Sequence, residues 1–307
     1  MNIAVTGGAG FIGSHIVEKL VDRGDNVIVI DNLQTGKKEN LKTVWDKINF
    51  LEMDIRNFDL LKTELKNIDG IFHEAALASV QDSFVKPKEY HDVNVKGTEN
   101  IFKLAKEFGF KVVYASSSSV YGNPIKIPIN EESGKNPINP YAQTKVDDEI
   151  IAEKYAKEGV RIIGLRYFNV FGERQSKNYA GVIKLFLERI ENYNPPIING
   201  DGSQIRDFVY VKDVVQANIM ALESNVKNAF INIGTGKTVS IVELANQIIK
   251  SSNLKLNPIH QGALKGDVME SKADVSLAKK LLNWEYKIEL KDWLEYTVSN
   301  LLKNKKE

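Results

Sequence analysis

The chain has 307 residues, of which 43% are hydrophobic and none is cysteine, and its formal net charge is +1. This length allows one large domain or two smaller ones. The near-zero charge, with no basic run except a short lysine-rich stretch at 303–306, argues against nucleic acid and anionic membranes as partners. The four histidines lack metal-ligand spacing, and no apolar run is long enough to span a membrane, so we expect no metal site and a cytosolic protein.

A short apolar segment at 2–7 predicts the first strand, which leads into a glycine-rich turn and a helix that begins near Phe11. The glycines fit two spacings, because Gly10 and Gly13 follow both Gly7 and Gly8 at suitable intervals. Glycine lets a pyrophosphate approach the backbone closely, and the helix N-terminus offers free N–H groups to its phosphates. Since a plain hairpin turn would fit the glycines equally well, the next segment decides between such a turn and a dinucleotide-binding site.

That segment favours a dinucleotide-binding unit. Apolar residues at helical spacing run from Ile12 to Val21, and a buried strand at 26–31 follows. The strand ends in Asp31, 18 positions after Gly13. Strand, glycines, helix, strand and acid in this order predict a dinucleotide site.

The residues around Asp31 bear on the choice between NAD and NADP. A carboxylate here accepts hydrogen bonds from the adenosine ribose and repels a 2′-phosphate. Asn32 and Leu33 offer no cation to hold such a phosphate. Lys37 and Lys38 are the residues that favour NADP, but we interpret them as solvated loop charges and predict NAD.

Strands and helices alternate through more than half of the chain, with further strands predicted near 48–53, 69–74, 110–116 and 160–166. This alternation is typical of a Rossmann-type α/β fold, a doubly wound parallel sheet with helices on both faces. We expect a helical crossover from Tyr90 to Phe108 and an ordered loop from Gly122 to Pro140. We predict an NAD-binding domain at 1–170, with a returning segment near 208–235. A smaller, mostly α substrate-binding part at 171–307 would cover the carboxyl ends of the strands.

Tyr141 and Lys145 form a YxxxK pair directly after Pro140, which suits a helix N-terminus. Residues at i and i+4 share one face of a helix, so both side chains can point into one site. A free tyrosine is a poor base at neutral pH, but a neighbouring ammonium and a helix N-terminus both favour the phenolate. The pair is therefore a candidate proton-transfer unit, although one such pair is expected by chance in a chain of this size.

Four serines, Ser116 to Ser119, end the predicted fifth strand just before this helix. At the carboxyl end of a central strand their hydroxyls would face the same crevice and could hydrogen-bond a reacting oxygen. Serine clusters also form ordinary turns, so position is the argument for a role here.

Six segments now occur in order along nearly the whole chain: TGGAGFIGSH, DNL with a later TG, YASSSSVYG, NPYAQTK, LRYFNVFG and RDFVYVKDV. In these the chain resembles an extended short-chain dehydrogenase/reductase. It is most similar to the nucleotide-sugar 4-epimerases that act on UDP-glucose/galactose and their N-acetyl forms. The resemblance implies that Ser117 supplies the catalytic hydroxyl. Tyr141 would be the general base, and Lys145 its partner, which also holds the nicotinamide ribose.

The resemblance implies further contacts and a mechanism. Cofactor contacts are implied for Gly7, Gly10, Phe11, Ile12, Gly13, Asp31, Asn32, Leu33, Gly36, Asp54, Ile55, Ala75, Ala76, Ala78, Asn94 and Tyr167. Substrate contacts are implied for Ser79, Ser117, Ser118, Tyr141, Asn169, Val182, Arg206 and Ser271. In the mechanism, Tyr141 takes the proton of the 4-hydroxyl while hydride passes to NAD, the 4-keto sugar rotates, and hydride returns to its other face.

Some family patterns are missing from this chain. Related dehydratases and decarboxylases carry an acid just after the catalytic hydroxyl, where this chain has Ser118 and Ser119, and GDP-fucose-type synthases use a cysteine. We therefore expect epimerisation of UDP-hexoses at C4. The alternatives are an epimerase for another nucleotide sugar, such as UDP-glucuronate, and a non-catalytic NAD-binding regulatory protein, which would usually lack the YxxxK pair.

The substrate pocket has one favourable residue and one departure. In the epimerases a gatekeeper lies five positions after the glycine of a GD pair, here Ser271, and a small residue there should leave room for an N-acetyl group. The usual phosphate-binding arginines near that glycine are replaced by Leu264 and Met269, which leaves Arg206 as the main anchor for the diphosphate. The resemblance also implies a homodimer, joined by a four-helix bundle near 90–108 and 145–158.

Overall fold

The computed structural model describes residues 1–175 and 181–303, so the lysine-rich stretch at 304–306 lies outside it. Seven strands form one sheet in the order β11-β6-β5-β4-β1-β2-β3, and all their pairings are parallel. The strands are β1 (Asn2–Thr6), β2 (Asn26–Asp31), β3 (Ile48–Glu52), β4 (Gly70–His73), β5 (Lys111–Ser117), β6 (Ile162–Tyr167) and β11 (Asn228–Ile233). The predicted Rossmann-type α/β fold is confirmed.

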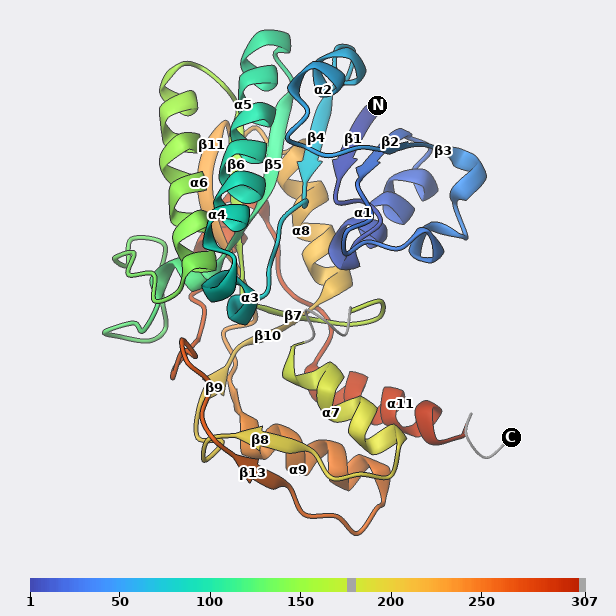
Figure 1. Cartoon of the computed structure of the whole chain (residues 1–307), viewed down its shortest axis with the longest axis vertical. Coiled ribbons are helices and arrows are strands. Elements are labelled where there is room, and N and C mark those ends of the chain that lie inside the picture. The colour runs from blue at the N-terminus through green and yellow to red at the C-terminus, as the bar shows by residue number, and fades with distance from the viewer. Residues whose placement is uncertain (176–180, 304–307) are drawn as a thin grey trace.

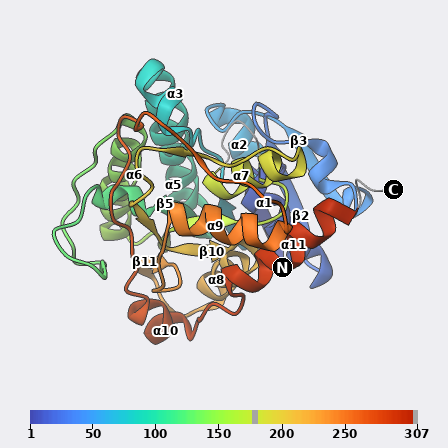
Figure 2. The same cartoon turned by 90° about the horizontal axis from the view of Figure 1, so that it is seen from below.

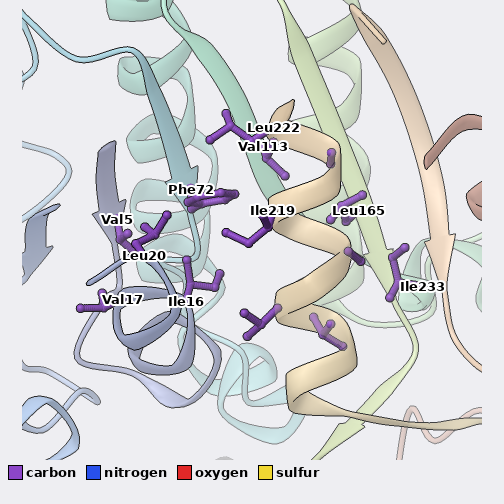
Figure 3. Close-up of a cluster of buried hydrophobic side chains, with 14 of the residues drawn as sticks. Val5, Ile16, Val17, Leu20, Phe72, Val113, Leu165, Ile219, Leu222 and Ile233 are labelled. Atoms are coloured by element: carbon purple, nitrogen blue, oxygen red, sulfur yellow. The ribbon is translucent and has the colours of Figure 1, made fainter. Parts of the chain in front are cut away.

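Helices cover both faces of this sheet, as Figure 1 shows. On one face lie α1 (Phe11–Asp22) and α8 (Val211–Glu223), whose apolar side chains pack on the strands. Figure 3 shows Ile16 and Leu20 of α1 and Ile219 of α8 against Phe72 of β4 and Leu165 of β6. On the other face lie α2 (Phe58–Glu64), α5 (Gly97–Phe108) and α6 (Pro140–Lys157). Because both faces are buried, the central strands are almost continuously apolar.

The C-terminal part lies beyond the carboxyl ends of the strands (Figures 1 and 2). Its core is built by α7 (Val182–Glu191), α9 (Ile241–Ser252) and α11 (Leu290–Lys303). Within the described residues, three two-stranded sheets lie outside the central sheet: β7 (Asn169–Phe171) with β10 (Phe208–Tyr210), β8 (Ile197–Asn199) with β13 (Ile259–Gln261), and β9 (Ile205–Arg206) with β12 (Val239–Ser240). The helix α10 (Ser276–Leu282) packs instead against the core on the α8 face.

The connections follow the expected pattern. The crossover before β5 is helical throughout its predicted range, since α4 (Pro87–Tyr90) runs into the π-helical turn η3 (His91–Lys96) and then α5. Other short helices are η1 (Lys38–Leu41), η2 (Trp45–Lys47), α3 (Val80–Val85) and η4 (Ser118–Tyr121). No regular element is assigned between Gly122 and Asn139, as expected for a loop.

The edge strand β11 is the part of the sheet that the sequence did not predict as a strand. Its residues fall within the predicted returning segment near 208–235, and β11 pairs with β6 over Asn228–Ile233. The first residues of β11 are exposed or half-buried, so the segment lacks the apolar run that identified the central strands. The division of the chain at residue 170 stays a prediction.

Candidate active site

A cavity opens where the carboxyl ends of five parallel strands meet. Each strand supplies a lining residue at or just after its end: Gly7 (β1), Asp31 (β2), Glu74 (β4), Ser117 (β5) and Tyr167 (β6). In open α/β sheets this edge is the usual place for ligands. The topology therefore gathers residues that lie far apart in the sequence.

The glycine turn after β1 forms the floor of this cavity. Gly7 has φ +65°, and a Cβ there would lie 2.7 Å from the backbone nitrogen of Ala75, so only glycine fits without strain. Within the described residues, the N–H groups of Phe11 and Ile12 at the start of α1 have no hydrogen-bond partner. The turn thus offers free donors at a helix N-terminus, which is a suitable site for phosphate.

The structure distinguishes between the two glycine spacings. Gly7, Gly10 and Gly13 line the cavity, whereas Gly8 does not. A Cβ at Gly8 would lie 2.7 Å from Cγ1 of Val29, so this glycine allows close packing of the turn against β2.

Asp31 lines the cavity and also holds the turn in place. Its Oδ2 accepts a hydrogen bond from the Ala9 N–H at 3.0 Å, and its Oδ1 accepts one from the Leu33 N–H at 2.8 Å. Burial raises the pKa of this carboxyl. Leu33 and Gly36 do not line the cavity; a Cβ at Gly36 would meet the Asp31 carboxylate at 2.7 Å.

The neighbouring wall is built from Asn32, Asp54 and Ile55, which all line the cavity. Asn32 donates to Asp54 at 3.0 Å, and hydrogen bonds from Arg56 lower the pKa of Asp54 to about 2. Two of the cations nearby are engaged, since Arg56 pairs with Asp54 and Lys38 pairs with Glu52 at 2.8 Å. A 2′-phosphate would meet two carboxylates here, Asp31 and Asp54, which supports the prediction of NAD.

Tyr141 and Lys145 enter the cavity from the first turns of α6. The helix begins at Pro140, and the Asn139 side chain accepts the N–H of Ala142 at 2.8 Å as an N-cap. Lys145 Nζ donates to the carbonyl of Ala115 in β5 at 2.9 Å, which fixes the ammonium at the cavity wall. The predicted pair thus faces one site.

The serines at the end of β5 have different surroundings. Ser117 lines the cavity, and its Oγ accepts the N–H of Ser119 at 3.1 Å. Ser116 donates to Glu149 at 2.7 Å, in a buried network with Arg166. Ser118 begins η4 and does not line the cavity. Of the two serines predicted to contact the substrate, Ser117 and Ser118, it is therefore Ser117 that lines the cavity together with Tyr141 and Lys145.

The family model for the NAD dependent epimerase/dehydratase family matches residues 3–234. The chain belongs to this family. A curated relative, a putative UDP-glucose 4-epimerase from Methanocaldococcus jannaschii, is 42% identical and covers 98% of both chains. UDP-glucuronic acid decarboxylase 1 from Arabidopsis thaliana is 35% identical over 98% of this chain and 69% of its own length. The solved UDP-glucose 4-epimerase from Thermotoga maritima, in complex with UDP-glucose, has a TM-score of 0.94 at 37% identity and covers 100% of both chains.

Membership makes this protein an NAD-dependent enzyme of the epimerase/dehydratase family, and it confirms the predicted resemblance and cofactor. The cavity fits NAD in this chain's own residues: free N–H groups for the pyrophosphate at Phe11 and Ile12, and a carboxylate for the ribose at Asp31. The side chains of Ala75, Ala76 and Ala78 complete the lining next to Glu74.

Asn94 and Tyr167, also predicted to contact the cofactor, are placed differently. Tyr167 lines the cavity, and its hydroxyl donates to Glu74 at 2.9 Å. Asn94 is fully buried and does not line it; its amide brackets Leu77, accepting the Leu77 N–H at 2.8 Å and donating to the Leu77 carbonyl at 3.0 Å. Asn94 therefore supports the wall of the cavity from behind.

Apart from Ser117 and Tyr141, the residues predicted to bind the sugar nucleotide lie outside the cavity that NAD would fill. Ser79 caps α3, and Asn169 donates to the Asp207 carbonyl at 3.1 Å. Arg206 pairs with Asp267 of the GD dipeptide. The Ser271 N–H donates to the carbonyl of Ile205 in β9 at 3.2 Å, which places Ser271 close to Arg206, the next residue of that strand. Val182 begins α7. Their contacts with a substrate stay predictions.

Sequence reasoning missed three acids around the site. Glu74 lines the cavity, and Asp148 and Glu149 are fully buried behind Lys145. A run of three acids, 147–149, suggests a solvated surface, yet the spacing of three and four residues from Lys145 places Asp148 and Glu149 on the same side of α6. That spacing was the signal that could have found them.

The described residues bear on two absences that the sequence predicts, those of a metal site and of a membrane-spanning helix. Within residues 1–175 and 181–303, no group of histidine, aspartate and glutamate side chains is arranged to hold a metal ion. In the same part of the chain, no helix is long and apolar enough to cross a membrane. A cytosolic location stays a prediction.

Proposed function

We propose that this protein interconverts UDP-hexoses by inverting the configuration at C4. The observation that carries the proposal is the convergence of Ser117, Tyr141 and Lys145 on the cavity with the glycine turn. The similarity to UDP-glucose 4-epimerases over the full length supports it. An NAD-binding protein without activity would have no need for this set of side chains.

Each of the three side chains has a role that follows from its position. The Tyr141 phenolate takes the proton of the C4 hydroxyl, because the ammonium of Lys145 and the N-terminus of α6 both favour the anion. Ser117 donates a hydrogen bond to the same oxygen and holds it in place. Bound NAD would accept the C4 hydrogen together with its electron pair, and could return both to the opposite face of C4. Tyr141 would then give its proton back to the C4 oxygen.

The residues after Ser117 favour epimerisation over elimination or decarboxylation. An elimination needs an acid that delivers a proton to the leaving oxygen. Ser118 and Ser119 carry no carboxyl group, and the cavity acid Glu74 lies at the end of β4 and accepts the Tyr167 hydroxyl. The 4-keto sugar would therefore be reduced again without losing a substituent.

Ser271 supports acceptance of N-acetylhexosamines. The Ser271 N–H donates to the carbonyl of Ile205, the residue before Arg206. A small side chain is thus placed near Arg206, the expected anchor for the diphosphate. A small residue leaves volume that a tyrosine would fill. We propose that UDP-GlcNAc and UDP-GalNAc are substrates along with UDP-glucose and UDP-galactose.

The experiment is product analysis by NMR. The purified protein is incubated without added cofactor, separately with UDP-glucose, UDP-GlcNAc and UDP-glucuronate. A C4 epimer is expected from the first two, and failure with UDP-GlcNAc alone would remove the proposal for Ser271. Epimerisation of UDP-glucuronate only would identify the alternative substrate, and a pentose or a 4-keto-6-deoxy sugar would overturn the reaction type.

The matched control is Tyr141→Phe. This variant keeps the ring and loses the proton acceptor, so turnover should fall by at least about 10²-fold while NAD stays bound. Bound NAD is measured after denaturation by its absorbance. If the variant kept most of its turnover, Tyr141 would not be the base.

We also propose a homodimer formed through α5 and α6. These helices pack side by side on one face of the sheet (Figure 1), and their outer surface includes Ile150, which is 56% exposed. A second copy of this pair would complete a four-helix bundle.

A further inference from the structure

Lys145 has an unusual partner on its own helix. Its Nζ donates to Oδ2 of Asp148 at 3.3 Å, and the two residues are separated by three positions on α6. Lys145 is 4% exposed and Asp148 is fully buried. A lysine and an aspartate thus form a buried ion pair directly behind the wall of the cavity.

The contacts of Asp148 indicate that its negative charge, and not its packing, is what matters at this position. Its Oδ1 is buried and has no hydrogen-bond partner within the described residues, and Lys145 is its only ion-pair partner there. Burying a carboxylate with one oxygen unsatisfied costs free energy, and an ion pair of this kind is a weak source of stability. A structural role alone would be served better by an apolar side chain against β5.

We propose that Asp148 is a positioning residue that keeps Lys145 protonated and directs its ammonium group toward the cavity. The proposal rests on the function proposed above for Tyr141 and Lys145. Lys145 can favour the Tyr141 phenolate, and hold ribose hydroxyls, only as an ammonium. A lysine buried without a counter-charge tends to lose its proton, and Asp148 supplies that counter-charge from the side away from the ligand.

The charges around the pair agree with this assignment. Burial alone would lower the pKa of Lys145, but the attraction of Asp148, with that of Tyr141 and Glu74, raises it above its ordinary value. Burial raises the pKa of Asp148 to about 7 against the pull of Lys145. The carboxylate therefore carries its charge above about pH 7, the range in which an unpaired buried lysine would begin to deprotonate.

Other groups that face the pair do not replace Asp148. From β4, His73 is neutral near pH 7, because burial lowers its pKa to about 3. Burial also raises the pKa of Glu74 to about 7, but the Glu74 carboxylate accepts the Tyr167 hydroxyl, whereas Asp148 accepts directly from Lys145 Nζ at 3.3 Å. From β5, the buried Tyr114 stays protonated, since burial, with Glu149 and Asp148, raises its pKa well above the ordinary value.

Two more acids on α6, Asp147 and Glu149, lie next to Asp148 in the sequence. Glu149 is bound by Arg166 at 2.8 Å and by Lys135 at 2.7 Å, so its charge is already balanced. Asp147 is only half-buried and accepts from Gln143 at 2.9 Å. Asp148 is thus the acid on this helix whose charge acts on Lys145.

The test compares Asp148→Asn with the wild type as a function of pH. NAD-loaded protein is placed with an excess of an NAD-consuming enzyme, and the rate at which NAD leaves is measured from pH 6 to pH 10. The two proteins should release NAD at similar rates at pH 6, where Asp148 is uncharged. At pH 10 release from Asp148→Asn should be several-fold faster, because Lys145 should lose its proton at a pH about one unit lower or more.

The alkaline limb of kcat/KM should move down in pH by the same amount, with KM and kcat measured separately. Asp147→Asn is the matched control: it removes the same charge from the neighbouring position and should leave both profiles unchanged. In a Lys145→Met background, Asp148→Asn should change the release of NAD no further.

A uniform loss of activity or of NAD at every pH, without a shifted limb, would overturn the proposal and leave Asp148 a merely structural residue. Asp148→Ala guards against a folding artefact, since it should show the same shifted limb. If the wild type turned over no nucleotide sugar, the proposed function would fail, but NAD release would still test Asp148 on its own.

Discussion

Glu74 is the cavity residue whose charge depends most on its surroundings. Its Oε1 accepts the Tyr167 hydroxyl, which in turn accepts the amide of Asn218 at 2.8 Å. Burial raises the pKa of Glu74 from 4.5 to about 7, although Tyr167 and Lys145 oppose the change. At neutral pH, therefore, about half of the molecules carry this charge on the cavity wall.

This shift predicts how stability depends on pH. Between pH 4.5 and 7 the folded protein holds a proton that the unfolded chain has released, so the stability contributed by protonated Glu74 is complete below pH 4.5 and is lost as pH rises through 7. Glu74→Gln imitates the protonated form at every pH. Without NAD, the variant should match the wild type at pH 4.5 and exceed its stability at pH 8 by on the order of 2 kcal/mol.

Thermal unfolding at the two pH values, followed by calorimetry, measures the difference. Glu39→Gln, at an exposed glutamate, is the control and should show no dependence of this kind. An equal difference between Glu74→Gln and the wild type at both pH values would mean that the carboxyl is not shifted by the fold.

Among single residues, the sequence predicted those whose role follows from a fixed spacing along a helix or from the end of a strand. It missed those whose role depends on burial. Tyr141, Lys145 and Ser117 were found because a helix face and a strand end bring them together. Glu74 and Asp148 were missed because their chemistry depends on burial, and a charged residue in a sequence is usually on the surface. The roles of Asn169, Arg206 and Ser271 stay predictions.

Among the elements, α6 links the fold to the proposed chemistry. Its first turn carries Tyr141, and its N-cap is Asn139, which is 7% exposed and accepts the Ala142 N–H. Its second turn brings Lys145 against the Ala115 carbonyl of β5. The position of the Tyr141 phenol therefore depends on the N-cap that fixes the first turn of α6.

Asn139→Ala should cost about 1 kcal/mol of stability, the usual value for a lost N-cap, and lower kcat by roughly tenfold because Tyr141 is held less firmly. Ser240→Ala is the matched control, since Ser240 caps α9, which carries no residue of the cavity. It should cost a similar free energy and leave kcat unchanged. Equal effects of both variants on kcat would show that stability, and not the position of Tyr141, limits activity.

The elements themselves were largely predictable. Parallel strands buried on both faces are continuous apolar runs, and β1, β2, β4, β5 and β6 largely have that character, so their order along the chain gave the fold class. The edge strand β11 has it only in its last half, and its place depends on pairing with β6, a contact that no local pattern encodes. The same holds for the two-residue and three-residue strands of the C-terminal part.

For the whole molecule, the cavity and the proposed dimer surface lie on different parts of one chain. The cavity lies at the carboxyl ends of the strands. The outer surface of α5 and α6 is lined by charged pairs such as Lys103–Glu99 and Lys106–Glu158, with Ile150 exposed among them. Assembly and cofactor binding should therefore be separable.

We expect light scattering to give twice the chain mass of 34.5 kDa for the wild type. Ile150→Glu should shift the protein to one chain mass, because burying a glutamate without a partner between the two copies is unfavourable. Tyr296→Glu, at a 73% exposed position on α11 away from α6 (Figure 1), should leave the dimer intact. The monomeric Ile150→Glu should still hold NAD, since Ile150 does not line the cavity. A monomeric wild type would refute the dimer, and loss of NAD on dissociation would mean that α6 needs its partner to keep Tyr141 and Lys145 in place.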